Sequence, residues 1–123
     1  MQPIKDRNPK PTEIHLRKSA GVLAVTFDNG EAFELPFEYL RVFSPSAEVR
    51  GHGTEILQVG KENVKVKDVE PVGSYAVRLI FDDGHDTGLY SWTVLYDLGT
   101  NQKANWTRYL QRLKEAGVQR SGG

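Results

Sequence analysis

The chain has 123 residues, of which 38% are hydrophobic and 26% charged, and this predicts a single globular domain with a substantial core. It contains no cysteine, which excludes disulfides, Cys-ligated zinc and Cys-ligated iron–sulfur clusters within the chain. Lys plus Arg and Asp plus Glu both number 16, and this zero net charge argues against a dedicated nucleic-acid binder.

The two ends of the chain are predicted to be flexible. Residues 1–11 are polar and contain three prolines, which cannot donate backbone hydrogen bonds, and residues 118–123 are polar as well. No stretch carries the run of about 18 apolar residues that spans a membrane, and the start of the chain lacks the apolar segment of a signal peptide. We therefore expect one domain over residues 12–117, between a flexible arm and a flexible tail, in the cytoplasm.

The start of the domain predicts three strands joined by tight turns. Residues 13–17 alternate polar and apolar side chains, which is the period of a half-buried strand. Residues 22–27 repeat the alternation. The Asn29-Gly30 pair then supplies the positive-φ residues that a hairpin turn needs before residues 31–35 return. An antiparallel hairpin is expected here.

A short helix and a loop are predicted next. Pro36 suits the first turn of a helix because its φ is fixed, so residues 37–41 are expected to form one or two helical turns. Ser44 and Pro45 have the residue types of a helix cap and a first helical position. They open an exposed loop over residues 44–55.

The second half predicts further strands and then helices. Strands are expected at residues 56–59, 64–69 and 75–81, with a break at residues 71–73 and a short return strand at residues 85–89.

Two helices complete the predicted domain. Ser91 is expected to cap a helix that Gly99 ends, and Asn101 and Gly117 are expected to bound a last, longer helix. An apolar stripe at helical spacing supports the last helix, and it consists of Trp106, Tyr109, Leu110 and Leu113.

These elements predict an α+β fold, with a mostly antiparallel sheet built from hairpins and two helices of the C-terminal half packed on one face. Residues 25–30 and 79–84 also match each other at an offset of 54 residues. Two ordinary hairpins are the favoured interpretation, because turn chemistry alone makes such matches common. The alternative is a pair of related strand–turn–strand–helix units packed together.

The densest group of chemically capable side chains is Asp82, Asp83, His85 and Asp86. Carboxylates and imidazole could bind a divalent metal, although their order does not fit an EF-hand loop. The favoured interpretation is structural, since aspartates in such turns accept hydrogen bonds from the local backbone.

His52 lies between two glycines and is interpreted first as a surface-loop residue. A shared site of His52 and His85 would require the loop to fold over the turn. No G-x-S-x-G elbow, Walker A, G-x-G-x-x-G or H-E-x-x-H pattern is present, and a serine hydrolase is not expected. The last helix has a basic face of Lys103, Arg108, Arg112 and Lys114, which is either a solvated surface or a site for an acidic partner.

Three stretches carry a family resemblance. They are Tyr39-Leu40-Arg41 with Ser44-Pro45-Ser46-Ala47-Glu48-Val49-Arg50-Gly51-His52-Gly53, then Pro71-Val72-Gly73-Ser74-Tyr75-Ala76-Val77, then Phe81-Asp82-Asp83-Gly84-His85-Asp86-Thr87-Gly88-Leu89-Tyr90-Ser91-Trp92. With them, the chain resembles the DUF971 family, also called the gamma-butyrobetaine hydroxylase-like N-terminal domain, over roughly residues 12–116.

The resemblance implies a non-catalytic domain. In gamma-butyrobetaine hydroxylase and trimethyllysine hydroxylase such a domain precedes a separate iron-dependent oxygenase domain and holds a structural zinc through three Cys and one His. His85 falls at the position of that His, and Ser44 and Ser46 fall at the positions of a Cys-x-Cys pair. Because a hydroxyl is a poor zinc ligand beside a thiolate, the zinc site is expected to be dismantled here.

The oxygenase domain is not part of this sequence, so hydroxylase activity is not expected. A similar domain is also fused to Mrp-type ATPases that carry iron–sulfur clusters, and this association links the family to metal or cluster handling.

We therefore expect a non-catalytic accessory or binding module, with a metalloprotein or iron–sulfur assembly factor as its protein partner and without membrane or nucleic-acid binding. The residues expected to contact the partner are Ser44, Ser46, Arg50, His52, His85 and Tyr90. The alternative is a metal-binding protein that holds zinc or iron through His85, Asp83, Asp86 and His52. A small enzyme with His85 as general base is the third hypothesis.

Overall fold

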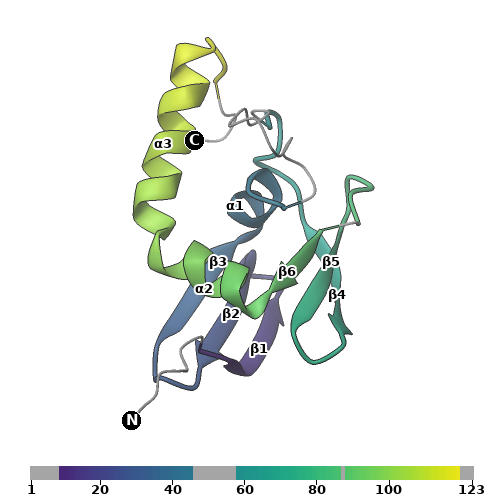
Figure 1. Ribbon diagram of the computed structural model, residues 1–123. Helices are drawn as coiled ribbons and strands as arrows, with labels where there is room; N and C mark the ends of the chain where they lie inside the picture. Colours follow the sequence, from purple (N-terminus) through teal and green to yellow (C-terminus); the bar gives the residue numbers. More distant parts are fainter. Residues whose placement is uncertain (1–8, 46–57, 87, 120–123) are drawn as a thin grey trace.

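The computed structural model describes residues 9–45, 58–86 and 88–119 (Figure 1). Six strands and three helices follow one another along these residues. Their order is β1 (Pro11–Arg17), β2 (Val22–Phe27), β3 (Ala32–Pro36), α1 (Phe37–Val42), β4 (Val66–Val72), β5 (Ala76–Phe81), β6 (Leu89–Ser91), α2 (Trp92–Thr100) and α3 (Gln102–Glu115).

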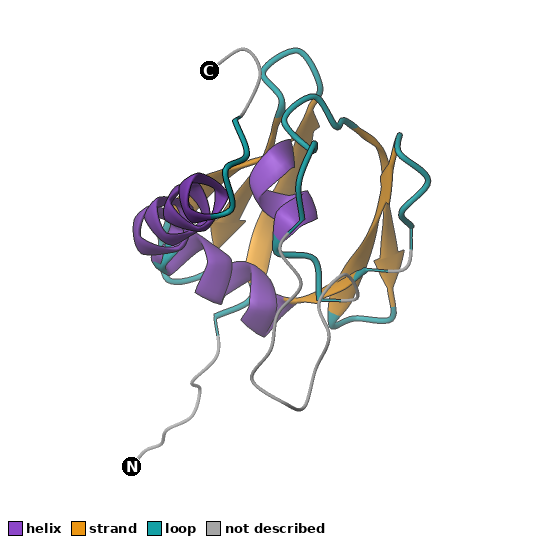
Figure 2. Ribbon diagram, turned by 90° about the horizontal axis from the view of Figure 1, so that it is seen from above, coloured by secondary structure: helices purple, strands orange, loops and turns teal. Residues whose placement is uncertain are grey.

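The strands form two antiparallel sheets of three strands each, in the orders β1-β2-β3 and β4-β5-β6. The predicted α+β class and its hairpins are confirmed, and the strands divide between two sheets. Figure 2 shows the helices gathered together beside the strands. No helix in the described ranges is long and apolar enough to cross a membrane.

One apolar core joins the two sheets to α1 and α2, and a smaller cluster of Val42, Tyr109 and Leu113 packs α3 against the end of α1. The inward residues of β2 and β5 are almost fully buried, as the alternation predicts. All six residues of α1 are buried, including its two charged ones. The side chains with no exposed surface at all include Leu23, Leu35, Tyr39, Leu40, Leu79, Tyr90 and Leu95.

The two halves of the chain repeat the same backbone geometry. In the first turn the Gly30 amide donates to the Phe27 carbonyl, and the Phe27 amide donates to the Glu31 carbonyl. The second turn has the same two bonds, between Gly84 and Phe81 and between Phe81 and His85. The two glycines have φ angles of 90° and 91°.

The strand register repeats as well. β1 pairs with β2 from Pro11↔Phe27 onward, and β4 pairs with β5 from Val66↔Phe81 onward, each with an irregularity directly after the first pair. The helix that follows each sheet also begins in the same way. The amide of its first residue donates a 3.0 Å hydrogen bond to the carbonyl of the residue before the middle strand, from Phe37 to Gly21 in the first unit and from Trp92 to Tyr75 in the second. The structure therefore supports two related strand–turn–strand–helix units over two ordinary hairpins.

Each unit places its helix on the turn of the other unit. Arg41 of α1 contacts Asp83 in the second turn. Tyr96 of α2 contacts Asn29 and Glu31 in the first turn. This exchange brings the end of α1 to the turn in which the sequence concentrates its acidic and imidazole groups.

Several predicted details are corrected. β4 continues through Pro71, which an edge strand tolerates because the missing N–H faces no partner strand. Tyr75 precedes β5 and is 55% exposed, and Leu110 is 38% exposed instead of lying in the core. Asn101 gives α3 no side-chain cap, because its amide is bonded to Asp97.

Other predicted boundaries hold. Ser91 caps α2 by accepting from the Val94 amide at 3.1 Å, and Gly117 ends α3 with a φ of 75°. The helix expected after Ser44 lies largely outside the described residues, as does half of the strand expected at residues 56–59, whose residues 58 and 59 are not in a strand.

Gly99 does not end α2 as predicted but lies inside it, against the ring of Phe33. A Cβ at this position would be 2.4 Å from Cδ2 of Phe33. The ring cannot retreat easily, because Phe27 and Tyr96 pack edge-on against it. Glycine is therefore required here for close packing of the helix on β3.

Gly99→Ala is expected to destabilise the protein by about 1–2 kcal/mol, because the overpacking penalty exceeds the roughly 1 kcal/mol that alanine gains in a helix. Urea unfolding of the variant and the parent measures the difference. The same substitution in a Phe33→Leu background is the control and should cost less. An unchanged or raised unfolding midpoint for Gly99→Ala alone would contradict the close approach.

Candidate functional site

The candidate site lies where the end of α1 meets the second turn. α1 contributes Arg41, and Ser44 follows directly after the helix. The turn contributes Asp83 and His85, and β6 contributes Tyr90. These side chains come from segments about 40 residues apart in the chain, and the exchange of helices between the two units brings them together.

The turn itself is fixed by its own backbone and by the Asp83 side chain. Oδ1 of Asp83 accepts the backbone amide of His85 at 3.1 Å. Asp82 ties the turn to the segment before β4, since its Oδ1 accepts the Lys65 amide at 3.0 Å. Asp83 therefore bonds the local backbone as the favoured interpretation predicts, whereas Asp82 bonds a residue 17 positions earlier in the chain.

The second carboxylate oxygen of Asp83 accepts hydrogen bonds from two positively charged side chains. Oδ2 accepts from Nε of Arg41 and from Nζ of Lys61, each at 2.8 Å. Burial alone would raise the pKa of the Asp83 carboxyl, but the hydrogen bonds from Lys61, the His85 amide and Arg41 lower that pKa to about 2. Arg41 is 7% exposed, so this carboxylate compensates a charge that is almost removed from water.

Ser44 and His85 face each other. Oγ of Ser44 lies 2.9 Å from Nε2 of His85, and Ser44 has no exposed surface. Burial and the positive charge of Arg41 lower the pKa of the His85 imidazole, with a smaller effect of Lys61 in the same direction and an opposing effect of Asp83. The neutral imidazole is therefore the favoured form in the folded protein.

Tyr90 lies on the buried side of the site. Its hydroxyl donates to the Leu40 carbonyl at 2.7 Å, and the side chain has no exposed surface. Burial raises the pKa of Tyr90, and a hydrogen bond with Ser44 opposes the shift only in part. A continuous polar path thus runs from His85 through Ser44 and Tyr90 to the backbone of α1.

The other predicted site residues are not part of this cluster. Asp86 is half-exposed, with Oδ2 3.8 Å from Nη1 of Arg78, and its carbonyl accepts from the same guanidinium at 3.0 Å. Ser46, Arg50 and His52 lie outside the described residues.

The donor set does not fit the zinc centre that the family resemblance implies. A hydroxyl stands beside His85 where a thiolate would be needed, and both oxygens of Asp83 already accept other hydrogen bonds. Within residues 9–45, 58–86 and 88–119 no three His, Asp or Glu side chains are arranged to hold a metal ion.

Sequence reasoning did not assign Arg41 and Lys61 to the site. The available signal was the position of Arg41, since a charged residue on the apolar side of a short helix needs a buried partner. Lys61 carried no such signal, because it lies before β4 in a segment that reads as an ordinary polar turn.

The depressed pKa of His85 makes folding stability depend on pH. A histidine whose pKa is lower when folded contributes stability that is complete above its unfolded value, about 6.5, and that is lost as the pH falls below it. We therefore expect the free energy of unfolding to fall between about pH 7 and pH 5, and the His85→Gln variant to lose this part of the slope.

The exposed His15 provides the matched control. His15→Gln keeps His85 and should retain the part of the slope that His85→Gln loses, and an NMR titration should give His85 a lower pKa than a histidine in a short peptide. A His85 pKa at or above the peptide value would contradict the site geometry.

Comparison with known proteins identifies the family of this chain. The family described as gamma-butyrobetaine hydroxylase-like, N-terminal, matches residues 14–96. No curated protein matches the chain.

Three solved structures are similar over most of their length. A protein solved by NMR in solution is 52% identical, with 98% of this chain and 90% of that chain covered and a TM-score of 0.81. A second NMR structure is 46% identical, with coverage of 94% and 92% and a TM-score of 0.81. The crystal structure of a DUF971 protein of unknown function from Acidithiobacillus ferrooxidans is 39% identical, with coverage of 77% and 98% and a TM-score of 0.64. The chain therefore belongs to the DUF971 family of gamma-butyrobetaine hydroxylase-like N-terminal domains.

Proposed function

We propose that this protein is a non-catalytic accessory module that binds a protein partner through the surface of the second turn. We define this turn surface by Lys61, Asp83, His85 and Asp86. The observation that carries the proposal is the bonding of Asp83, which accepts from Arg41, Lys61 and the His85 amide at once. The turn is thereby held in one conformation, and a pre-ordered surface loses little entropy on binding.

The same bonding argues against catalysis. Ser44 is fully buried and faces inward to Tyr90, so its hydroxyl is not placed to attack a substrate. Asp83 bonds the backbone of His85 and the cations beside it, whereas the orienting acid of a triad holds the imidazole ring.

The residues expected to contact a partner divide into two roles in this proposal. His85 is part of the turn surface, while Ser44 and Tyr90 are fully buried and support it from behind. The loop residues Ser46, Arg50 and His52 remain predicted contacts. The proposed class of partner, a metalloprotein or iron–sulfur assembly factor, rests on the fusion of similar domains to Mrp-type ATPases that carry iron–sulfur clusters.

Affinity capture from cell extract with turn-surface variants tests the proposal. The full chain is expected to enrich a metalloprotein or iron–sulfur assembly factor, and Asp86→Lys should abolish the enrichment because it reverses a half-exposed charge on this surface. His85→Ala should weaken it as well. Mass spectrometry of the captured proteins gives the readout.

Two variants on the opposite hairpin serve as controls. Glu13→Lys makes the same charge change at an equally exposed carboxylate of β1, and His15→Ala removes an exposed imidazole. Equal capture by all four variants and the parent, or capture only of unrelated proteins, would refute the proposal. Thermal unfolding of each variant shows whether it is folded.

A divalent cation at His85 is the second candidate function. The lowered pKa of His85 favours it, because the neutral imidazole is the form that binds metal. Asp86 is the neighbouring half-exposed carboxylate, 3.8 Å from Nη1 of Arg78, and His52 is the further predicted ligand.

Titration with zinc or ferrous iron, followed by NMR of the histidine side chains, tests this alternative. Binding tighter than about millimolar that disappears in His85→Ala and persists in His15→Ala would support a metal site. Weaker binding, or binding that His85→Ala leaves unchanged, would exclude it.

A further inference from the structure

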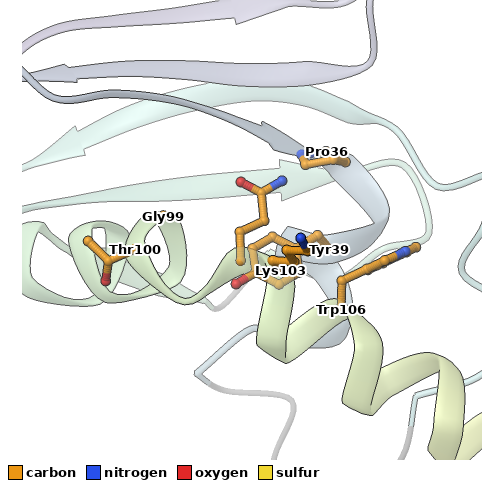
Figure 3. A pocket seen from close by; sticks show the side chains of 7 residues that line it. Pro36, Tyr39, Gly99, Thr100, Lys103 and Trp106 are labelled. Atoms are coloured by element: carbon orange, nitrogen blue, oxygen red, sulfur yellow. The ribbon is translucent and has the colours of Figure 1, made fainter.

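A groove lies between the junction of β3 with α1 and the corner of α2 with α3 (Figure 3). Its volume is about 570 Å³, within the range of sites that accept a ligand or a peptide side chain. The lining residues are Pro36, Tyr39, Gly99, Thr100, Gln102, Lys103 and Trp106.

The groove is built on rigid contacts. The Tyr39 hydroxyl donates to the Leu98 carbonyl at 2.7 Å and accepts from Nδ2 of Asn105 at 3.0 Å. The Trp106 ring packs edge-on against Tyr39 with ring centroids 6.3 Å apart. Gln102 fastens the helix corner to β3, since Nε2 donates to the Glu34 carbonyl at 3.2 Å. An apolar side chain would therefore meet the partly exposed ring of Trp106, which the fully buried Tyr39 holds in place.

The flank of α3 beside the groove is basic. Lys103, Arg108 and Lys114 are exposed and form no ion pair within the described part of the chain. The one acidic residue of α3, Glu115, accepts from Nε2 of Gln111 at 3.1 Å. Among the described residues, Lys103, Arg108 and Lys114 therefore keep positive charge on this helix without an ion-pair partner.

The spacing on α3 joins the groove to the basic residues. Lys103, Trp106, Leu110 and Lys114 recur at three- and four-residue intervals, which places them along one side of the helix. Leu110 is 38% exposed there. An apolar strip thus continues from the groove along α3, with a lysine at each end about 16 Å apart.

We propose that this groove and strip dock an acidic segment of a partner protein. One apolar side chain of the segment enters the groove beside the partly exposed Trp106, and carboxylates on both sides of it face Lys103 and Lys114. About five extended residues span the distance between the two lysines. The aromatic groove and the zero net charge favour a protein segment over nucleic acid, whose binding needs a larger basic excess.

This surface is independent of the proposed function. α3 lies on one side of the molecule, and the second sheet with its turn lies on the other side (Figure 1). Loss of binding at one surface therefore leaves the other available for its own test.

A synthetic peptide with one phenylalanine between two runs of three acidic residues is the probe. Titration of the full chain in low salt is expected to shift the NMR signals of the Trp106 indole, Lys103 and Leu110. The indole of Trp92 should not move, because it lies elsewhere and donates to the Ser74 carbonyl. The double variant Lys103→Glu with Lys114→Glu should bind at least about tenfold more weakly, since two attractions become repulsions.

Lys65→Glu with Lys67→Glu is the matched control, because it makes the same change in net charge at two exposed lysines at the start of β4, which lies on the other side of the molecule from α3 (Figure 1). Retained binding in this control supports the proposal. Equal weakening in both double variants would overturn it, as would equal binding of a peptide with glycine in place of phenylalanine. Tighter binding of a single-stranded oligonucleotide of the same charge would assign the surface to nucleic acid instead.

Discussion

The structure depends on the complete burial of α1, a helix of six residues that carries two charged side chains into the interior. Such a helix is too short to be stable alone, so its contacts must hold it. Asp83 neutralises Arg41, Tyr109 donates to Glu38 at 2.8 Å, and Tyr90 donates to the Leu40 carbonyl. Both sheets, α3 and the candidate site are therefore positioned by the same two helical turns.

Local patterns in the sequence were sufficient to predict the hairpins, the cap at Ser91 and the end of α3 at Gly117, because each depends on neighbouring residues. The division into two sheets depends on contacts between distant segments and has no local signal. Gly99 shows the difference clearly. A glycine near the end of a helix usually marks that end, but here the nearby Phe33 ring decides its role.

The candidate site was predictable only in part, for the same reason. His85 and Asp83 are conspicuous in sequence, and the resemblance placed Ser44 beside His85, where the structure has it. The pairing of Asp83 with Arg41 and Lys61 requires the exchange of helices between the units, which residue types alone do not reveal. In sequence this turn resembles a metal site, but in the structure Arg41 and Lys61 already neutralise its Asp83 carboxylate.

The repeated units also show how one framework can hold two unlike sites. At the second turn, Arg41 and Ser44 at the end of α1 meet a carboxylate and an imidazole, whereas at the first turn Tyr96 of α2 packs against the rings of Phe27 and Phe33. Because each half supplies the helix that covers the other half, neither half can complete its core by itself. The two halves are therefore expected to unfold together in a single transition, as small domains usually do.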